Sequence, residues 1–322
     1  DDAQLYADNT SGSSIDVAAV SIANGSTQAG ADADAGGIVQ NGFGRTVDIQ
    51  AVNNGAINAT AEADASGMSA DADASVVGIG QGGYSALRLA EGDDGAGAVN
   101  LYALNDSEGV IAVAAEANAN GFSANAESYA GGIVQEGFAR GDVTADVDNH
   151  GTILVSSRAS AEGFGADAEA YGIGIGQYIG ADGGDAGGDV FNGSMSSIDV
   201  SVVAEAQSDF DNASADAFGV GIGQVGEAFL GSADVATDNS GSIDADVFAS
   251  SHANSAEAFA DRIAAGVAQG AFGTEGAQIH GDNNGLIEVS AEANAGGPSA
   301  YTTAEAVGWA QAQSRAAARA MA

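Results

Sequence analysis

Apolar and polar residues alternate with a period of two along almost the whole chain. Between residues 111 and 120, Ile111, Val113 and three alanines alternate with alanine, glutamate and asparagine. Residues 57–66 repeat the pattern, with Ile57 and four alanines at every second position. Successive side chains of a strand point to opposite faces of a sheet. The pattern therefore predicts β-strands with one apolar face and one polar face.

These strands belong to a repeated unit of about 45 residues. An isoleucine opens each unit, and a second alternating strand ends in a Gly-Ile-x-Gln signature. A third, shorter strand then leads to an Asn/Asp/Gly turn. The connection after the signature tolerates insertion, most clearly at residues 91–97. The seven signature glutamines, the last in a degraded copy, are Gln40, Gln81, Gln135, Gln177, Gln224, Gln269 and Gln311.

The repeat predicts an all-β fold, a right-handed parallel β-solenoid of about seven repeats that forms one domain over residues 1–322. One large coil or two smaller coils could make up each repeat. A single three-sided coil needs only the three strands that the pattern shows. Alanine is the best helix former, but the period of two and the frequent glycines favour strands. The tail at residues 312–322 is the exception, because Arg315 and Arg319 lie four apart in an alanine-rich run that favours a short helix.

Composition narrows the function. The chain has 45 acidic residues against 7 basic ones, a net charge of −38 and no cysteine. Phosphate backbones would repel it, so we expect no nucleic-acid partner, and disulfides and thiolate chemistry are excluded. The chain contains no apolar run of about 18 residues, so we expect no membrane-spanning helix. Burial of an alanine methyl contributes only about 0.8 kcal/mol, so a regular backbone hydrogen-bond lattice has to order the chain.

Two columns of side chains follow from aligning the units on the signature. Stacked glutamine amides can hydrogen-bond along the coil axis, so Gln40, Gln81, Gln135, Gln177, Gln224 and Gln269 are expected to form a structural ladder. Aromatic residues recur a few positions later. They fill the corner of each coil or form an exposed row for lateral contacts: Phe43, Tyr84, Phe138, Phe229 and Phe272.

Acidic residues occupy the position eight before the signature glutamine in six of the seven units: Asp32, Asp73, Glu127, Glu169, Asp216 and Asp261, with Thr303 in the seventh. Stacked like charges require screening, protonation or bound cations, and Ca²⁺ prefers carboxylate oxygens. No cofactor is required, and Ca²⁺ is the candidate metal. The alternative is a solvated acidic face that keeps the chain soluble. A second, less complete column comprises Asp16, Asp199, Asp244 and Glu288.

The Asn-x-Gly-x-Ile start, the alternation of alanine with acidic and amide residues, and the Gly-Ile-x-Gln signature resemble the β-solenoid repeats of autotransporter-like surface proteins of Gram-negative bacteria. The resemblance covers nearly the whole chain. It implies secretion, an extracellular or cell-surface location, and a role in adhesion or matrix formation, with a host or matrix ligand as a further partner.

The two ends of the chain correspond to different positions within the repeated unit. Residues 4–9 resemble the third strand at residues 100–105, so residues 1–10 read as the end of a unit whose first strands are missing. Residues 11–311 then hold the repeats, and the last unit shows no clear third strand. These ends predict a head-to-tail homopolymer, an extracellular filament in which one subunit completes the coil of the next. The expected interface residues are Leu5, Tyr6, Ala7, Trp309 and Gln311.

A frayed end of arbitrary phase is the other interpretation of the termini, and a monomeric cell-surface adhesin is the alternative function. Catalysis is not expected. Acids recur at repeating positions throughout, so no single pair stands out as the two carboxylates of a glycosidase.

Overall fold

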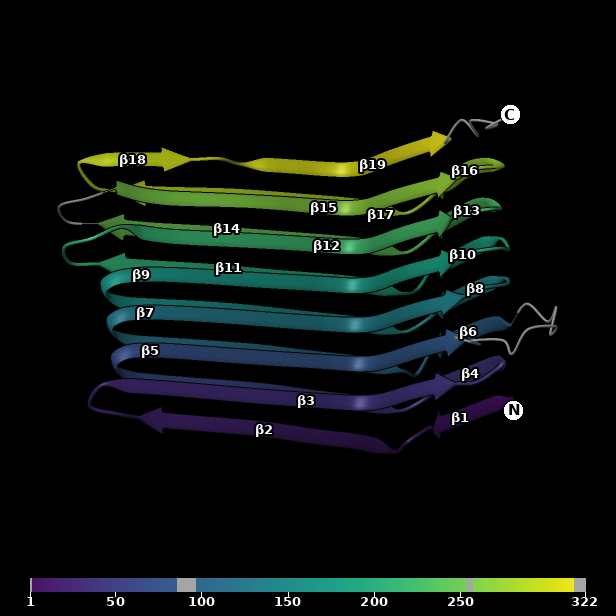
Figure 1. Cartoon of the computed structure of the whole chain (residues 1–322), viewed down its shortest axis with the longest axis horizontal. Coiled ribbons are helices and arrows are strands. Elements are labelled where there is room, and N and C mark those ends of the chain that lie inside the picture. The colour runs from purple at the N-terminus through teal and green to yellow at the C-terminus, as the bar shows by residue number, and fades with distance from the viewer. Residues whose placement is uncertain (1, 86–96, 254–256, 316–322) are drawn as a thin grey trace, which may run out of the picture.

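The structure is a computed structural model that describes residues 2–85, 97–253 and 257–315. The described residues form strands and no helix, and every strand pairing is parallel. Two sheets result, one of seven strands and one of twelve. The chain climbs layer by layer from the N-terminus to the C-terminus (Figure 1). The predicted all-β fold with long parallel sheets is therefore confirmed.

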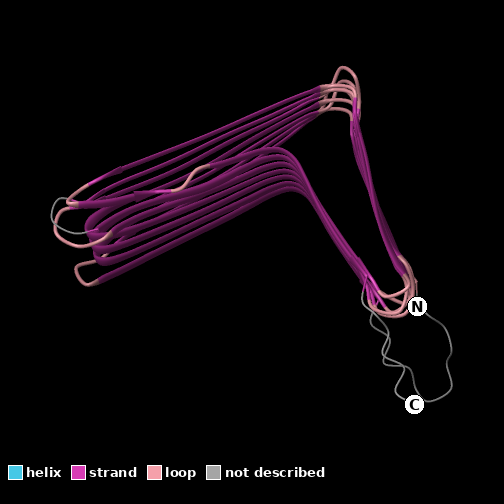
Figure 2. Ribbon diagram, turned by 90° about the horizontal axis from the view of Figure 1, so that it is seen from above, coloured by secondary structure: helices cyan, strands magenta, loops and turns pink. Residues whose placement is uncertain are grey.

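Each layer has three sides (Figure 2). The short first side is the seven-stranded sheet. It comprises β1 (Ala3–Asn9), β4 (Thr46–Asn53), β6 (Ala98–Asn105), β8 (Val143–Asn149), β10 (Ala186–Asn192), β13 (Ser232–Asn239) and β16 (Gly276–Asn283).

The second and third sides form the twelve-stranded sheet. The second side comprises β2 (Ser14–Asn24), β11 (Ser197–Ser208), β14 (Ser242–Ala253) and β17 (Leu286–Gly296). The third comprises β3 (Gln28–Phe43), β12 (Ala213–Ala228), β15 (Glu257–Gly273), β18 (Ser299–Thr302) and β19 (Glu305–Arg315). In three layers one long strand supplies both sides: β5 (Ala56–Ser85), β7 (Val110–Ala139) and β9 (Thr152–Ala181).

The second and third sides pack face to face over most of their length and then diverge where the third side bends (Figure 2). Alternating inward residues fill the space between them. Ile57 is fully buried, and so are most of the alanines that follow it at every second position. The hydroxyls of Ser128 and Ser157, from opposite sides, lie 2.7 Å apart, so the two sides touch through very small side chains.

A glycine three residues before each signature glutamine makes the bend. A Cβ at Gly78 would lie 2.3 Å from Ile111 Cγ2 and 2.7 Å from the carbonyl oxygen of Gly132 in the next layer. At Gly174 the corresponding Cβ would lie 2.3 Å from Ile198 Cγ2. The opening isoleucine therefore packs directly on the bend of the opposite side, and only glycine leaves it room.

The structure allows the layers to be counted from the short side. Counted in this way, β1 pairs with β4 of the same chain and begins a full layer with β2 and β3. The last layer, β16 to β19, likewise has all three sides. Residues 4–9 lie at the third-strand position of the repeat, and no third strand follows β19 among the described residues, but both end layers have three sides when each layer is counted from the short side.

The predicted C-terminal helix is wrong over residues 312–315, which continue β19 and pair with β15 in register. The row of N–H and C=O partners offered by β15 outweighs the helix propensity of alanine. Residues 316–322 of the tail, and residues 86–96 of the inserted connection, lie outside the described residues.

Candidate functional site

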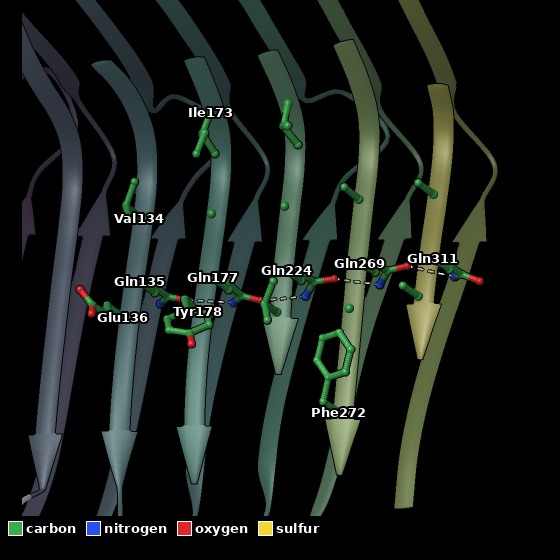
Figure 3. A pocket seen from close by; sticks show the side chains of 18 of the residues that line it. Val134, Gln135, Glu136, Ile173, Gln177, Tyr178, Gln224, Gln269, Phe272 and Gln311 are labelled. Carbon is green, nitrogen blue, oxygen red and sulfur yellow. Dashed lines mark hydrogen bonds between the residues drawn. The ribbon is translucent and has the colours of Figure 1, made fainter. Parts of the chain in front are cut away.

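The signature glutamines lie in register through the stack, from Gln40 opposite Gln81 to Gln269 opposite Gln311. From Gln81 onward, each Nε2 donates to the Oε1 of the glutamine one layer earlier, over 2.7 Å from Gln224 to Gln177 and 3.0 Å from Gln311 to Gln269. Figure 3 shows this glutamine ladder crossing the strands. The Nε2 groups also donate to carbonyl oxygens of the short side, for example Gln177 to Ala145 over 2.7 Å. One layer is therefore bonded to the next through its interior.

A second ladder, of asparagines, ends the short side of each layer, and the sequence analysis missed it. Here Nδ2 donates to the Oδ1 of the asparagine one layer later, over 2.7 Å from Asn192 to Asn239. The second hydrogen of Asn192 Nδ2 goes to the carbonyl oxygen of Ser242 over 3.4 Å. The asparagine ladder comprises Asn9, Asn53, Asn105, Asn149, Asn192, Asn239 and Asn283. Its signal was the repeated asparagine that had been assigned to turns.

The two ladders run in opposite directions, so each end layer presents one open donor and one open acceptor. In the last layer Asn283 accepts from Asn239, and within the described part of the chain its Nδ2 has no acceptor. Gln311 donates to Gln269, and no donor among the described residues reaches its Oε1. In the first layer Gln40 Nε2 donates only to the carbonyl oxygen of Gln50, among the residues described.

The five expected interface residues all lie in the end layers, Leu5, Tyr6 and Ala7 in β1 and Trp309 and Gln311 in β19. Leu5 and Ala7 face inward and are half-buried, whereas Tyr6 faces outward and is 65% exposed. Trp309 is half-buried and donates to Gln269 Oε1 over 3.1 Å.

The predicted carboxylates also lie in register on the outer face of the third side. The structure pairs Asp32 with Asp73, Glu127 with Glu169, and Asp216 with Asp261 across successive layers. The side chain of Asp261 lies outside the described residues. We call Asp32, Asp73, Glu127, Glu169, Asp216 and Asp261 the carboxylate column.

Charges within the column affect each other. Partial burial raises the pKa of Asp73, and the carboxylates of Asp71 and Asp32 add to the effect. Burial, Asp73 and Glu169 raise the pKa of Glu127 in the same way. A hydrogen bond of 2.8 Å to Glu169, together with burial, raises the pKa of Tyr171 to about 12. The carboxylates of the column therefore repel one another when they are ionised.

Three carboxylates, those of Asp167, Glu169 and Asp216, offer oxygens that lie within 4.8 Å of one another. Among the described residues, this group of two column members and the neighbouring Asp167 could hold a hard cation such as Ca²⁺. The second acidic column is broken. Asp199, Asp244 and Glu288 are neighbours, but Asp16 stacks on Asn58 instead.

The predicted aromatic corner is wrong, because these rings face outward. Phe43 is 72% exposed, and its ring stacks on Tyr84 with centroids 5.3 Å apart. Tyr84 in turn stacks on Phe138. An aromatic residue an odd number of positions after an inward glutamine must point out of the coil. The row is therefore a feature of the outer surface.

The outward face of the third side is concave at the bend, and it holds a groove of about 620 Å³ there. We call it the crook groove. Phe218, Ile173 and Val220 precede the bend on one wall, and Tyr178 and Phe272 follow it on the other. Figure 3 shows Ile173 and the two rings of the far wall on opposite sides of the glutamine ladder along the strands. The groove crosses β7, β9, β12, β15 and β19.

No family model, curated protein or solved structure matches this chain. No described helix is long and apolar enough to cross a membrane.

Proposed function

We propose that this chain is a structural subunit of an extracellular filament, in which the last layer of one copy stacks on the first layer of the next. The proposal takes the fold to be a right-handed solenoid of seven repeats, and it assigns the chain a mechanical role without catalysis. It modifies the end-completion model: whole layers meet, and neither copy supplies a missing strand to the other.

The matched ends of the two ladders carry the proposal. Stacking places the open Nδ2 of Asn283 against Oδ1 of Asn9 in the next copy. It also places Nε2 of Gln40 in that copy against the open Oε1 of Gln311. Asn9 Oδ1 already accepts from Ser13 Oγ over 2.6 Å. Asn192 Oδ1 accepts both from the equivalent Ser196 and from Asn149, so one carboxamide oxygen in this fold holds both bonds.

Apolar burial supports the same contact. The inward residues Ile15 and Val17 of the first layer and Ile287 and Val289 of the last are half-buried, whereas Ile57 and the other opening isoleucines between them are buried. Stacking would cover these edges and pair the open backbone groups of the end strands. An unprotected strand edge is a template for pairing, and a head-to-tail contact that does not close gives a filament.

An Asn283→Asp substitution tests the contact. Aspartate retains the oxygen that accepts from Asn239, so the fold is preserved, but it replaces the outward donor with an acceptor that faces Asn9 Oδ1 of the next copy. Asn284→Asp is the matched control, because it makes the same charge change at the neighbouring exposed turn residue. Sedimentation and electron microscopy of the purified chain, with and without Ca²⁺, provide the measurement.

We expect filaments from the parent chain and from Asn284→Asp, and monomers with an unchanged melting temperature from Asn283→Asp. Persistent monomers of the parent chain would contradict the filament. Equal assembly of the two variants would contradict the role of the ladder. A monomer that binds a surface ligand would instead favour the adhesin alternative. Extracellular location, from the repeat resemblance, and Ca²⁺ held by the carboxylate column belong to the same proposal.

A further inference from the structure

The crook groove lies on the side of the stack, so contacts between the end layers of two copies in a filament do not cover it. Its walls are outward-facing apolar and aromatic residues, and the equivalent positions in β3 and β5, which lie outside the groove, carry Asp34, Ser75 and Asn41. Its floor comprises Val134, Gly176, Gly223, Ala268 and Ala310. Four of these five floor residues are glycine or alanine, which leaves the groove open across its five strands.

The size of the groove limits its occupant. Five layers at about 4.8 Å span about 19 Å between the first and the last. An α-helix of that length and about 10 Å across would occupy about 1,500 Å³. The groove volume of 620 Å³ lies instead within the range of about 300–1,000 Å³ that holds small ligands. An elongated small molecule therefore fills the groove, whereas more than half of a peptide helix would lie outside it.

The acidic residues around the groove favour a ligand of positive charge. Glu136 belongs to its wall, and the Tyr178 hydroxyl on that wall donates to Glu227 over 3.3 Å. On the other wall, Asp216 of the carboxylate column stands two residues before Phe218. None of the lining residues is basic. Aromatic faces also attract cations directly. A second copy of the chain, with the same charge of −38, would be repelled from this surface.

We propose that the crook groove binds an elongated cationic amphiphile, whose apolar or aromatic body lies along the stack and whose ammonium or amidinium group lies at the carboxylates. The aromatic rings contact the body, and Glu136 and Glu227 attract the cationic group. The site is independent of filament formation, since it is complete within one chain.

The floor glycines allow a test that preserves the fold. A Cβ at Gly223 would meet only Val220 Cγ1, at 3.5 Å, and Val39 and Val134 occupy the same position in other layers. Gly223→Val should therefore fold normally and fill the floor of the groove. Gly30→Val is the matched control, because Gly30 faces outward on the third side, far along the strand from the bend, and its Cβ would meet nothing within 4 Å.

Isothermal titration at physiological salt would compare three amphiphiles with one chain length, each below its micelle concentration: dodecyltrimethylammonium, dodecyl maltoside and dodecyl sulfate. We expect saturable binding of the ammonium compound and at least tenfold weaker binding of the other two. Gly223→Val should weaken ammonium binding at least tenfold, and Gly30→Val should leave it unchanged. Glu136→Gln should weaken the ammonium compound severalfold without affecting the maltoside.

Equal binding of the cationic and neutral compounds would overturn the charge selection. Unchanged ammonium binding by Gly223→Val would overturn the groove as the site, and would assign the binding to the acidic surface in general. Melting temperatures of the variants, measured in parallel, would show that each is folded.

Discussion

Replacement of Gln177 by leucine tests whether the glutamine ladder stabilises the interior. Leucine has nearly the same volume but makes no hydrogen bond. The substitution removes the bond from Nε2 to Gln135 and the bond received from Gln224. It also removes the bonds from Nε2 to the carbonyl oxygens of Ala145 and Asp189. Gln224 keeps its bonds to Gly188 and Ala236, but the buried Oε1 of Gln135 loses its donor.

The expected loss in the free energy of unfolding follows from these contacts. A buried acceptor left without a donor costs about 1–3 kcal/mol, and each net hydrogen bond contributes about 1 kcal/mol. Part of the loss is offset by leucine, which is more favourably buried than an amide. We expect the free energy of unfolding to fall by about 3 kcal/mol. At about 2.1 cal/mol/K per residue, a chain of 322 residues then melts about 4 °C lower.

Thermal and guanidinium unfolding followed by circular dichroism would measure the change. Gln50→Leu is the control, because Gln50 lies on the exposed outer face of β4, and we expect its effect to stay under about 0.5 kcal/mol. Gln177→Leu with the unfolding midpoint of the parent chain would refute the reasoning.

The other predictions concern the bend and the carboxylate column. Gly174→Ala should destabilise the fold by about 2 kcal/mol or more, since its Cβ would lie 2.3 Å from Ile198 Cγ2, whereas Gly30→Ala should leave the melting temperature unchanged. Burial and three neighbouring carboxylates raise the pKa of Asp73 above 3.8, so the folded state binds that proton more tightly than the unfolded state. The melting temperature should therefore rise as pH falls through the raised pKa toward 3.8, and Asp73→Asn should remove part of this rise. Millimolar Ca²⁺ should raise the melting temperature of the parent chain more than that of Glu169→Gln, and equal shifts would argue against Ca²⁺ in the column.

Period-two alternation was enough to predict the strands, because a coil with tiny inward residues has to place every second side chain inside. The register of the glutamines followed from the same rule. The exposed aromatic row could have been predicted as well: Phe43 lies three residues after the inward Gln40, and an odd offset points outward. The corner assignment failed because it did not take this offset into account.

Other features depend on contacts between distant layers. The asparagine ladder was hidden because asparagine before glycine is also a common turn signal, and only the stacked structure shows Asn53 fully buried. The crook groove arises where the third side bends, and its lining comes from five strands that only the parallel register aligns. Local propensity likewise could not predict that residues 312–315 would pair with β15.

Cryo-electron microscopy of the assembled chain tests the account most directly. If whole chains stack end to end, the seven strands of the short side, spaced by about 4.8 Å, predict an axial rise of about 34 Å per subunit. The filament should be polar, with β16 of each copy parallel to β1 of the next. Filaments with two-fold axes between subunits, or with a rise that does not accommodate a full stack of layers, would contradict it.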